Sequence, residues 1–222
     1  MYMIYQQSYI CTWEEFIEKK NTLDLYAVYC DGNRIIGFTG LCYKKIVVDD
    51  ENYMAVYVGQ TVIPPTYRGK SLIQRTVLKL FFKHIFSHPF TTLVVWNNAL
   101  TYRPYLILAK GAKVYYPNSE NEQHLHYKNI QNTIGKTYYL EYYNPATGVV
   151  NKGYNVMKAH EVNYTAQETA DSDVHYYLKC NPGSVQGQGL ITFGLGTWEN
   201  IFFFFKKRLR RKLKMSSAIF RS

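Results

Sequence analysis

The chain has 222 residues, 47% of them hydrophobic and 17% aromatic, which excludes a largely disordered protein and allows one large domain with its own core. None of the four cysteines stands in a CxxC pair, which excludes a dense disulfide framework and favours a reducing, cytoplasmic compartment. The net charge of +10 is concentrated at the C-terminal end: eight of the 26 Lys and Arg residues lie beyond position 205, and residues 1–205 are nearly neutral.

The first third of the sequence predicts a helix and an antiparallel meander. Met3 to Ser8 suggests a short first strand, and Thr12-Trp-Glu-Glu15 is a capping box that predicts a helix to about Lys20. Turn residues and an acidic loop then separate three strands. Their expected ranges are Leu25 to Cys30, Arg34 to Val48 and Tyr53 to Ile63.

The next stretch predicts a helix, a strand and a second helix. A wide apolar face supports the first helix, β-branched residues support the strand, and Gly111 closes the second helix. Asn97-Asn98 is expected to end the strand. Short joints favour a right-handed crossover with a parallel strand pair beside the meander. The expected ranges are Arg68 or Ser71 to His88, Thr91 to Trp96, and Leu100 to Lys110.

The remainder has weaker periodicity. Residues 118–172 are rich in Tyr, Asn and Thr and predict an insertion or lid of short strands and loops, and Val174 to Lys179 predicts a strand. The glycines at 187–196 suggest loops or strand bulges. We therefore expect an α/β domain over 1–196 and a separate basic segment over 197–222.

The stretch Val62 to Phe82 contains the strongest functional signal. A strand end runs into Tyr67-Arg-Gly-Lys-Ser71 at the start of a helix, where unpaired backbone N–H groups and the positive end of the helix dipole meet. Gly69 permits close approach of the backbone, and Arg68 and Lys70 add positive charge. The stretch predicts an anion site, and the alternative is a structural turn without a ligand.

The order VIPPTYRGKS resembles the pattern Val-x-Pro-x-Tyr-Arg-Gly-Lys-Gly of the GNAT superfamily of N-acetyltransferases, and the resemblance extends over about residues 25–115. It implies a mixed central sheet with flanking helices, and a bulged strand before a turn that wraps the pyrophosphate of coenzyme A. Ser71 and Ile73 stand where the family has small residues. The residues that the resemblance assigns to cofactor binding are Val62, Ile63, Arg68, Gly69, Lys70 and Ser71.

The catalysis that the resemblance implies is direct attack of an amine on the thioester, with backbone N–H groups polarising its carbonyl. In the family a Tyr four residues before the helix-ending Gly protonates the thiolate, but Ile107 occupies that position. Tyr105 and Tyr102 are the nearest candidates, although on a helix they point about 160° and 140° away from Ile107. Glu51 or Asp50 could take the amine proton, or water could. No third ligand accompanies the histidine pair at 84 and 88, so no metal is expected.

The C-terminal segment predicts an amphipathic helix. Its apolar residues fall in an arc of about 120° with basic residues on the remaining face. This pattern indicates an interfacial helix on an anionic membrane, through residues 197–214. Nucleic-acid binding is the less favoured alternative, because no nucleic-acid motif accompanies the charge. A solvated tail whose aromatic residues join the core is the third. The apolar residues are Trp198, Ile201, Phe202, Phe205, Leu209 and Leu213.

Taken together, the sequence favours an acyltransferase that moves an acyl group from acetyl-CoA, a longer acyl-CoA or an acyl carrier protein to an amine of a small molecule, lipid or peptide. The tyrosines and phenylalanines and the amphipathic tail would suit a long acyl chain at the inner face of a membrane. The alternative is a catalytically silent module of the same fold with an interaction or regulatory role at a membrane.

Overall fold

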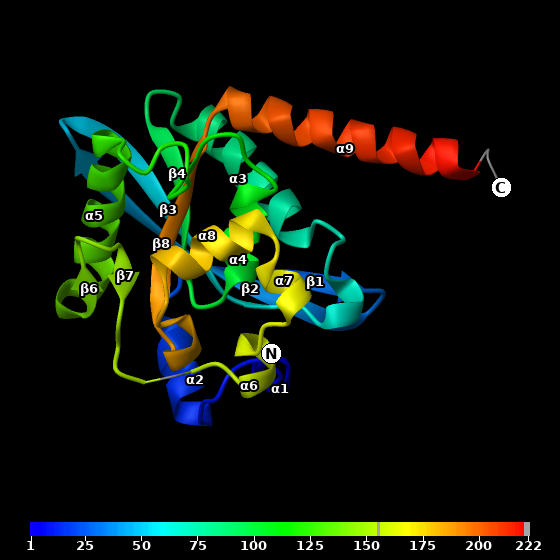
Figure 1. Ribbon diagram of the computed structural model, residues 1–222, viewed down its shortest axis with the longest axis horizontal. Coiled ribbons are helices and arrows are strands. Elements are labelled where there is room, and N and C mark those ends of the chain that lie inside the picture. Colours follow the sequence, from blue (N-terminus) through cyan, green and yellow to red (C-terminus); the bar gives the residue numbers. More distant parts are fainter. Residues whose placement is uncertain (155, 220–222) are drawn as a thin grey trace.

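The computed structural model describes residues 1–154 and 156–219, with side chains described as far as residue 210. Within these ranges, one eight-stranded mixed sheet has the order β1-β2-β3-β4-β8-β7-β6, and β5 pairs with β8 (Figure 1). The strands are β1 (Leu25–Asp31), β2 (Arg34–Val48), β3 (Glu51–Val62), β4 (Thr92–Ala99), β5 (Tyr115–Tyr116), β6 (Tyr143–Asn144), β7 (Val149–Val150) and β8 (Gly189–Gly196).

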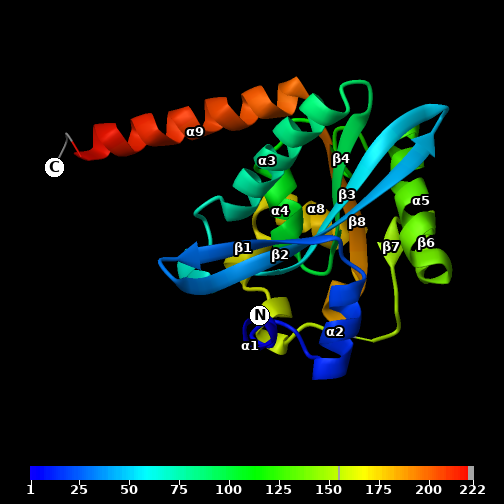
Figure 2. The same cartoon turned by 180° about the vertical axis from the view of Figure 1, so that it is seen from behind.

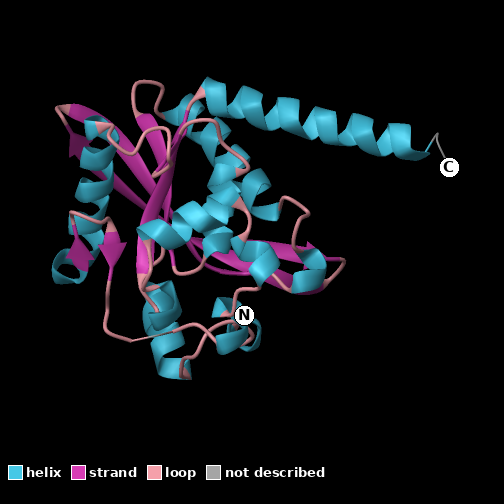
Figure 3. Ribbon diagram, viewed as in Figure 1, coloured by secondary structure: helices cyan, strands magenta, loops and turns pink. Residues whose placement is uncertain are grey.

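Helices flank this sheet on both faces (Figure 3). The helices are α1 (Tyr2–Tyr5), α2 (Trp13–Asn21), α3 (Leu72–Ser87), α4 (Tyr102–Ala109), α5 (Leu125–Tyr139), α6 (Ala159–Val162), α7 (Ala166–Thr169), α8 (Ser172–Cys180) and α9 (Trp198–Ile219). Short 3-10 turns lie at Pro65–Tyr67, Leu140–Tyr142 and Ser184–Gln186.

The predicted helix and meander are confirmed. Thr12 accepts the backbone N–H of Glu15 at 3.2 Å, and the Glu15 carboxylate accepts the backbone N–H of Thr12 at 2.9 Å, which completes the capping box of α2. Strands β1, β2 and β3 pair antiparallel in chain order. Local turn and cap chemistry was therefore sufficient to predict these elements.

The predicted parallel strand pair is also confirmed, because α3 connects β3 to β4 and the two strands pair in parallel from Tyr53↔Thr92 to Tyr57↔Trp96. The prediction that Asn97-Asn98 ends the strand is wrong. Strand β4 continues to Ala99, because it pairs with β8 from Leu93 to Ala99 and the Thr192 hydroxyl donates to Asn97 Oδ1 at 3.1 Å.

Two apolar layers cover opposite faces of the sheet. Val56 and Val95 pack with Phe81 of α3, whereas the neighbouring Ala55 and Trp96 belong to the cluster that contains α5. Since successive strand residues point to opposite faces, α3 and α5 lie on opposite sides of the sheet. Any opening between β3 and β4 therefore connects the α3 side with the α5 side.

Three predictions of local structure are wrong. Met3 to Ser8 forms α1 and a turn instead of a strand, and Val174 to Lys179 lies within α8, whose N-terminus Asp171 caps. The stretch 118–172 does contain short strands, β6 and β7, but it also contains the 15-residue helix α5, whose buried Ile130 and Ile134 lie one turn apart. Buried Gln131 in α5, and buried Tyr176 and Tyr177 in α8, obscured the helical periodicity.

The glycine-rich stretch read as loops or bulges contains β8, a buried strand in the middle of the sheet. A Cβ at Gly189 would lie 1.9 Å from Asn98 Oδ1, and one at Gly196 would lie 2.7 Å from the Leu93 Cβ. These glycines make room for neighbouring side chains within the strand, and they do not mark a loop.

The amphipathic C-terminal helix is confirmed as α9, which leaves the body of the protein and ends far from it (Figures 1 and 2). Its first turn is anchored: the Trp198 ring lies 5.3 Å from that of Phe81, and Ile201 is buried. Leu213 and the basic side chains from Arg211 onward lie outside the described side chains. No helix in the described ranges is long and apolar enough to cross a membrane.

Candidate active site

A bulge near the end of β3 separates it from β4. Gly40 pairs with Gly59 and Phe38 with Val62, so Thr39 faces two residues, and one of them, Gln60, has the left-handed φ of 48°. The register with β4 ends at Tyr57↔Trp96. Bulges bend strands and interrupt pairing, so the two strands diverge here and leave the edge of β3 without a strand partner.

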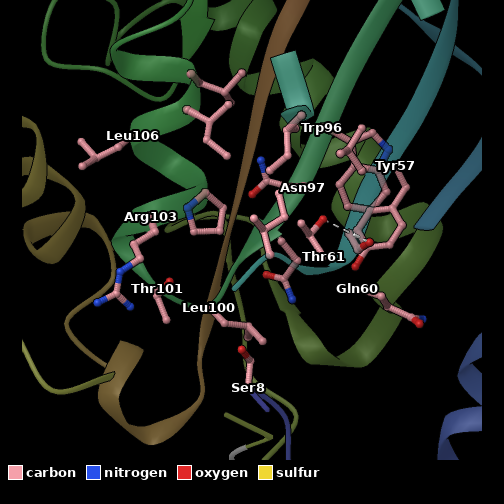
Figure 4. Close-up of a pocket in the computed structure, with 18 of the residues that line it drawn as sticks. Ser8, Tyr57, Gln60, Thr61, Trp96, Asn97, Leu100, Thr101, Arg103 and Leu106 are labelled. Atoms are coloured by element: carbon pink, nitrogen blue, oxygen red, sulfur yellow. Dashed lines mark hydrogen bonds between the residues drawn. The ribbon is translucent and has the colours of Figure 1, made fainter. Parts of the chain in front are cut away.

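A cavity of about 930 Å³ occupies this gap. It is lined by Val58 and Val95, which face α3, and also by Tyr57 and Trp96, which face α5. Figure 4 shows β3 residues on one side of the cavity and Arg103 of α4 on the other. The cavity therefore passes through the sheet and offers two arms, one on each face.

The arm on the α3 side begins at the turn that the sequence singled out. Gly69 and Ser71 have left-handed φ values of 77° and 58°, and Ser71 is the N-cap of α3 without a side-chain hydrogen bond to the helix. A Cβ at Gly69 would meet no atom within 4 Å. This position therefore favours glycine because of its left-handed φ, and not because a neighbouring group leaves no room for a side chain. The uncapped first turn of α3 leaves backbone N–H groups available to an anion.

Several cations line this arm. The Lys70 ammonium lies 4.4 Å from the centre of the Tyr67 ring. Lys207 and Arg208 also line it, and the Lys207 ammonium donates to the Lys110 carbonyl oxygen. The Lys110 ammonium is already paired with Asp171 and Asp173, at 3.1 Å and 2.5 Å. Helix α9 thus contributes two basic side chains to the wall of the cavity, which the sequence did not indicate.

Arg68, which the sequence assigned to the anion, is already paired. Its Nε donates to the Ile63 carbonyl at 3.0 Å, and its Nη2 donates to Glu161 Oε1 at 2.8 Å. Only Ile63, Gly69, Lys70 and Ser71 of the other assigned residues line the cavity, because Val62 packs in a separate cluster with Phe38.

Glu161 of α6 joins three parts of the chain at the cavity wall. It is 5% exposed and accepts from the Ser8 hydroxyl at 2.8 Å, from Arg68, and from Arg103 Nη1 at 2.9 Å. Desolvation raises the pKa of this carboxyl group, but hydrogen bonds from Ser8 and Arg68 and the arginine charges outweigh it and hold the pKa below its usual value. Arg68 lies 93 residues away, so no local sequence signal could have found this cluster.

The structure does not bring Tyr102 and Tyr105 to the cavity. Both are buried against α8, and the Tyr102 hydroxyl donates to the Glu168 carboxylate. Ile107 lines the cavity instead, on the opposite side of α4. Neither phenol can protonate a thiolate there, as the helical angles indicated.

Glu51, the candidate base for the amine proton, also lies away from the cavity. It lies at the tip of the β2–β3 hairpin, about 30 Å along β3 from the bulge at Gln60, and does not line the cavity. Its carboxylate accepts from the Tyr53 hydroxyl at 2.6 Å. The same hydroxyl lies 2.8 Å from His126 Nε2, and His126 Nδ1 lies 2.7 Å from Asp49, so these groups fasten α5 to the hairpin.

No group of three His, Cys, Asp or Glu side chains that could hold a metal occurs within the described part of the chain. His84 Nε2 lies 2.6 Å from the Thr91 carbonyl oxygen, and its ring stacks on that of His88 at 5.3 Å. The histidine pair therefore has a structural role at the end of α3.

No protein-family model matches the chain, and no curated protein sequence matches it. Similar solved structures include a mutant AtaT toxin bound to acetyl-CoA and the C-terminus of the antitoxin AtaR, at 17% identity and TM-score 0.35, covering 50% of this chain and 70% of that chain. Another is an aminoglycoside 6'-N-acetyltransferase complexed with coenzyme A, at 12% identity and TM-score 0.34, covering 83% and 79%.

Proposed function

We propose that the chain transfers an acyl group from a coenzyme A thioester to an amine inside this cavity. The observation that carries the proposal is the cavity that passes through the sheet at the β3 bulge and ends at the uncapped N-terminus of α3. A phosphate-bearing donor fits the basic α3 arm, and an acceptor can approach from the α5 side. The two reactants would meet in the gap between the strands.

In this proposal the backbone provides most of the catalysis. The unpaired edge of β3 after Tyr57 offers N–H groups to the thioester carbonyl oxygen, which gains negative charge as the amine nitrogen attacks. A C–N bond forms, the C–S bond breaks, and the thiolate leaves. Because Ile107 cannot donate a proton, water supplies it to the thiolate and accepts the proton of the amine.

A second candidate function is a module that binds coenzyme A or nothing at all and catalyses no transfer. Two observations favour it: Ile107 replaces a possible proton donor, and Glu161 already neutralises Arg68. Release of free thiol from acetyl-CoA and from palmitoyl-CoA, followed with a thiol reagent across a panel of amines, separates the two functions. Amine-dependent thiol release supports the transferase, and its absence despite coenzyme A binding supports the silent module. If acetyl-CoA competes for the cavity as well as palmitoyl-CoA does, this would argue against a donor with a long acyl chain.

We also propose that α9 binds the protein to the surface of an anionic bilayer. Phe202, Phe205 and Leu209 are 66%, 44% and 60% exposed and share one side of the helix. At about 100° per residue, the exposed Lys206 lies beside this strip, which suits a surface of negative lipid headgroups, whereas Arg208 on the other side of the strip lines the cavity. Juxtamembrane basic residues contribute roughly 1 kcal/mol each at such a surface.

Replacing Phe202, Phe205 and Leu209 together with Ser is expected to lower partitioning onto phosphatidylserine-containing vesicles at least tenfold, because burying each side chain contributes roughly 1.5–3 kcal/mol. Sedimentation with these vesicles measures the effect, with phosphatidylcholine vesicles for comparison. Exposed apolar residues elsewhere serve as controls, and Val47→Ser and Leu125→Ser should not change partitioning. Equal pelleting of the triple variant and the wild type would refute the proposal, and dimerisation without vesicles would assign the strip to a second copy.

A further inference from the structure

The arm of the cavity on the α5 side is walled by aromatic rings. The Trp96 ring lies 4.8 Å from that of Tyr57, 4.6 Å from that of Tyr138 and 6.3 Å from that of Tyr139. Tyr9 and Tyr154 also line the cavity. Flat apolar surfaces of this kind stack on aromatic or other planar groups.

The charges of this arm are positive. Lys19 and Lys152 line the cavity, and neither ammonium group forms a hydrogen bond or an ion pair with a residue in the described ranges. The Lys152 ammonium lies 5.3 Å from the centre of the Tyr139 ring, and partial burial and the nearby charge of Lys19 both lower its pKa. Two cations thus lie near each other without a carboxylate between them.

The only carboxylate that the described residues contribute to the cavity lining is that of Glu161. It is bound by Arg68 and Arg103 and has no free charge to offer to a cationic ligand. The phenols do not supply a negative charge either, because burial raises the pKa of Tyr57 to about 12 and raises that of Tyr9. At neutral pH the whole arm is therefore electropositive.

We propose that this arm selects an amine acceptor that carries both a planar group and a negatively charged group, a carboxylate or a phosphate, and that it rejects polycationic amines. The inference deepens the proposed acyl transfer and rests on it. The anionic group would pair with Lys19 and Lys152 while the planar group lies against the half-buried rings of Tyr57, Tyr138 and Tyr139, which Trp96 supports from within the core at 1% exposure. The same positive field lowers the pKa of the acceptor ammonium group, which favours the neutral amine that attacks.

Calorimetry with a matched set of probes tests the selection on the full chain, with and without saturating coenzyme A. L-Phenylalanine has a ring, an amine and a carboxylate; 2-phenylethylamine lacks only the carboxylate; (1-amino-2-phenylethyl)phosphonate replaces it with a phosphonate; spermidine is a polycation. We expect either anionic probe to bind at least roughly tenfold tighter than 2-phenylethylamine, as a charged hydrogen bond provides. A tighter phosphonate would indicate a phosphate-bearing acceptor, and a tighter carboxylate an amino acid-like one.

The double variant Lys19→Gln, Lys152→Gln should lose this preference, whereas Lys20→Gln should retain it, because Lys20 is exposed and does not line the cavity. Unchanged coenzyme A binding by the double variant confirms that it is folded. Stronger or equal binding of 2-phenylethylamine or spermidine, no binding of either anionic probe, or a preference that survives in the double variant would overturn the inference. Failure of coenzyme A to bind is a different result, which contradicts the proposed function.

Discussion

Replacing Ser71 with Asp is expected to weaken coenzyme A binding by roughly 100-fold. A carboxylate about 6 Å from a phosphate charge, at an effective dielectric constant near 20, repels it by roughly 3 kcal/mol. Ser71 has the left-handed conformation that Asp tolerates well, and a carboxylate at a helix N-terminus is stabilising. The variant should therefore bind coenzyme A poorly while its melting temperature stays the same or rises, as calorimetry and thermal unfolding would show.

The matched control is Ser71→Asn, which keeps the left-handed preference and nearly the same shape without the charge. Its affinity for coenzyme A should lie within a few-fold of that of the wild type. Equal affinities of the Asp and Asn variants would contradict an anion site at the start of α3.

Replacing Glu161 with Gln is expected to lower the free energy of unfolding by about 2 kcal/mol. Removing one partner of a buried ion pair costs roughly 3–5 kcal/mol. We expect a smaller loss here because the two arginine partners of Glu161 remain partly exposed to water. Their side chains, Arg68 and Arg103, are 37% and 31% exposed. Urea denaturation at neutral pH measures the loss.

The pH dependence gives a second signature of Glu161. Its pKa is lower in the folded state than in the unfolded chain, so its charge stabilises the fold above the unfolded value of about 4.3. That contribution disappears as pH falls through the folded pKa. The difference between wild type and Glu161→Gln should be constant from neutral pH to about 5.5 and shrink below about 4.3. The exposed Glu18, replaced with Gln, should change stability by less than about 0.5 kcal/mol. A Glu161 effect that does not depend on pH would indicate lost packing instead of lost charge.

Much of the fold could be predicted because its signals are local. The capping box at Thr12, the turn after β1 and the alternating strands each specify a conformation within a few residues. Helix α5 and strand β8 could not be predicted in this way. The buried residues of α5 include Gln131, partly buried tyrosines pack beside them, and β8 contains glycines that usually interrupt strands.

The residues of the candidate site were likewise predictable only where their signal is local in sequence. The turn at Gly69 and Ser71 was visible because a strand end, a glycine and a helix start are adjacent in sequence. Glu161, Lys19 and Lys152 reach the cavity from distant segments, and only the folded chain brings them together. The helical direction of Ile107 already indicated that Tyr102 and Tyr105 would point elsewhere, whereas the choice of Glu51 overlooked which end of β3 opens into the cavity.

Titration of the full chain with coenzyme A in a calorimeter tests the central claim most directly. We expect saturable binding at one site per chain, weakened by Ser71→Asp and retained by Ser71→Asn. No heat of binding at millimolar coenzyme A, or binding that both variants leave unchanged, would contradict the assignment of this cavity to a thioester donor.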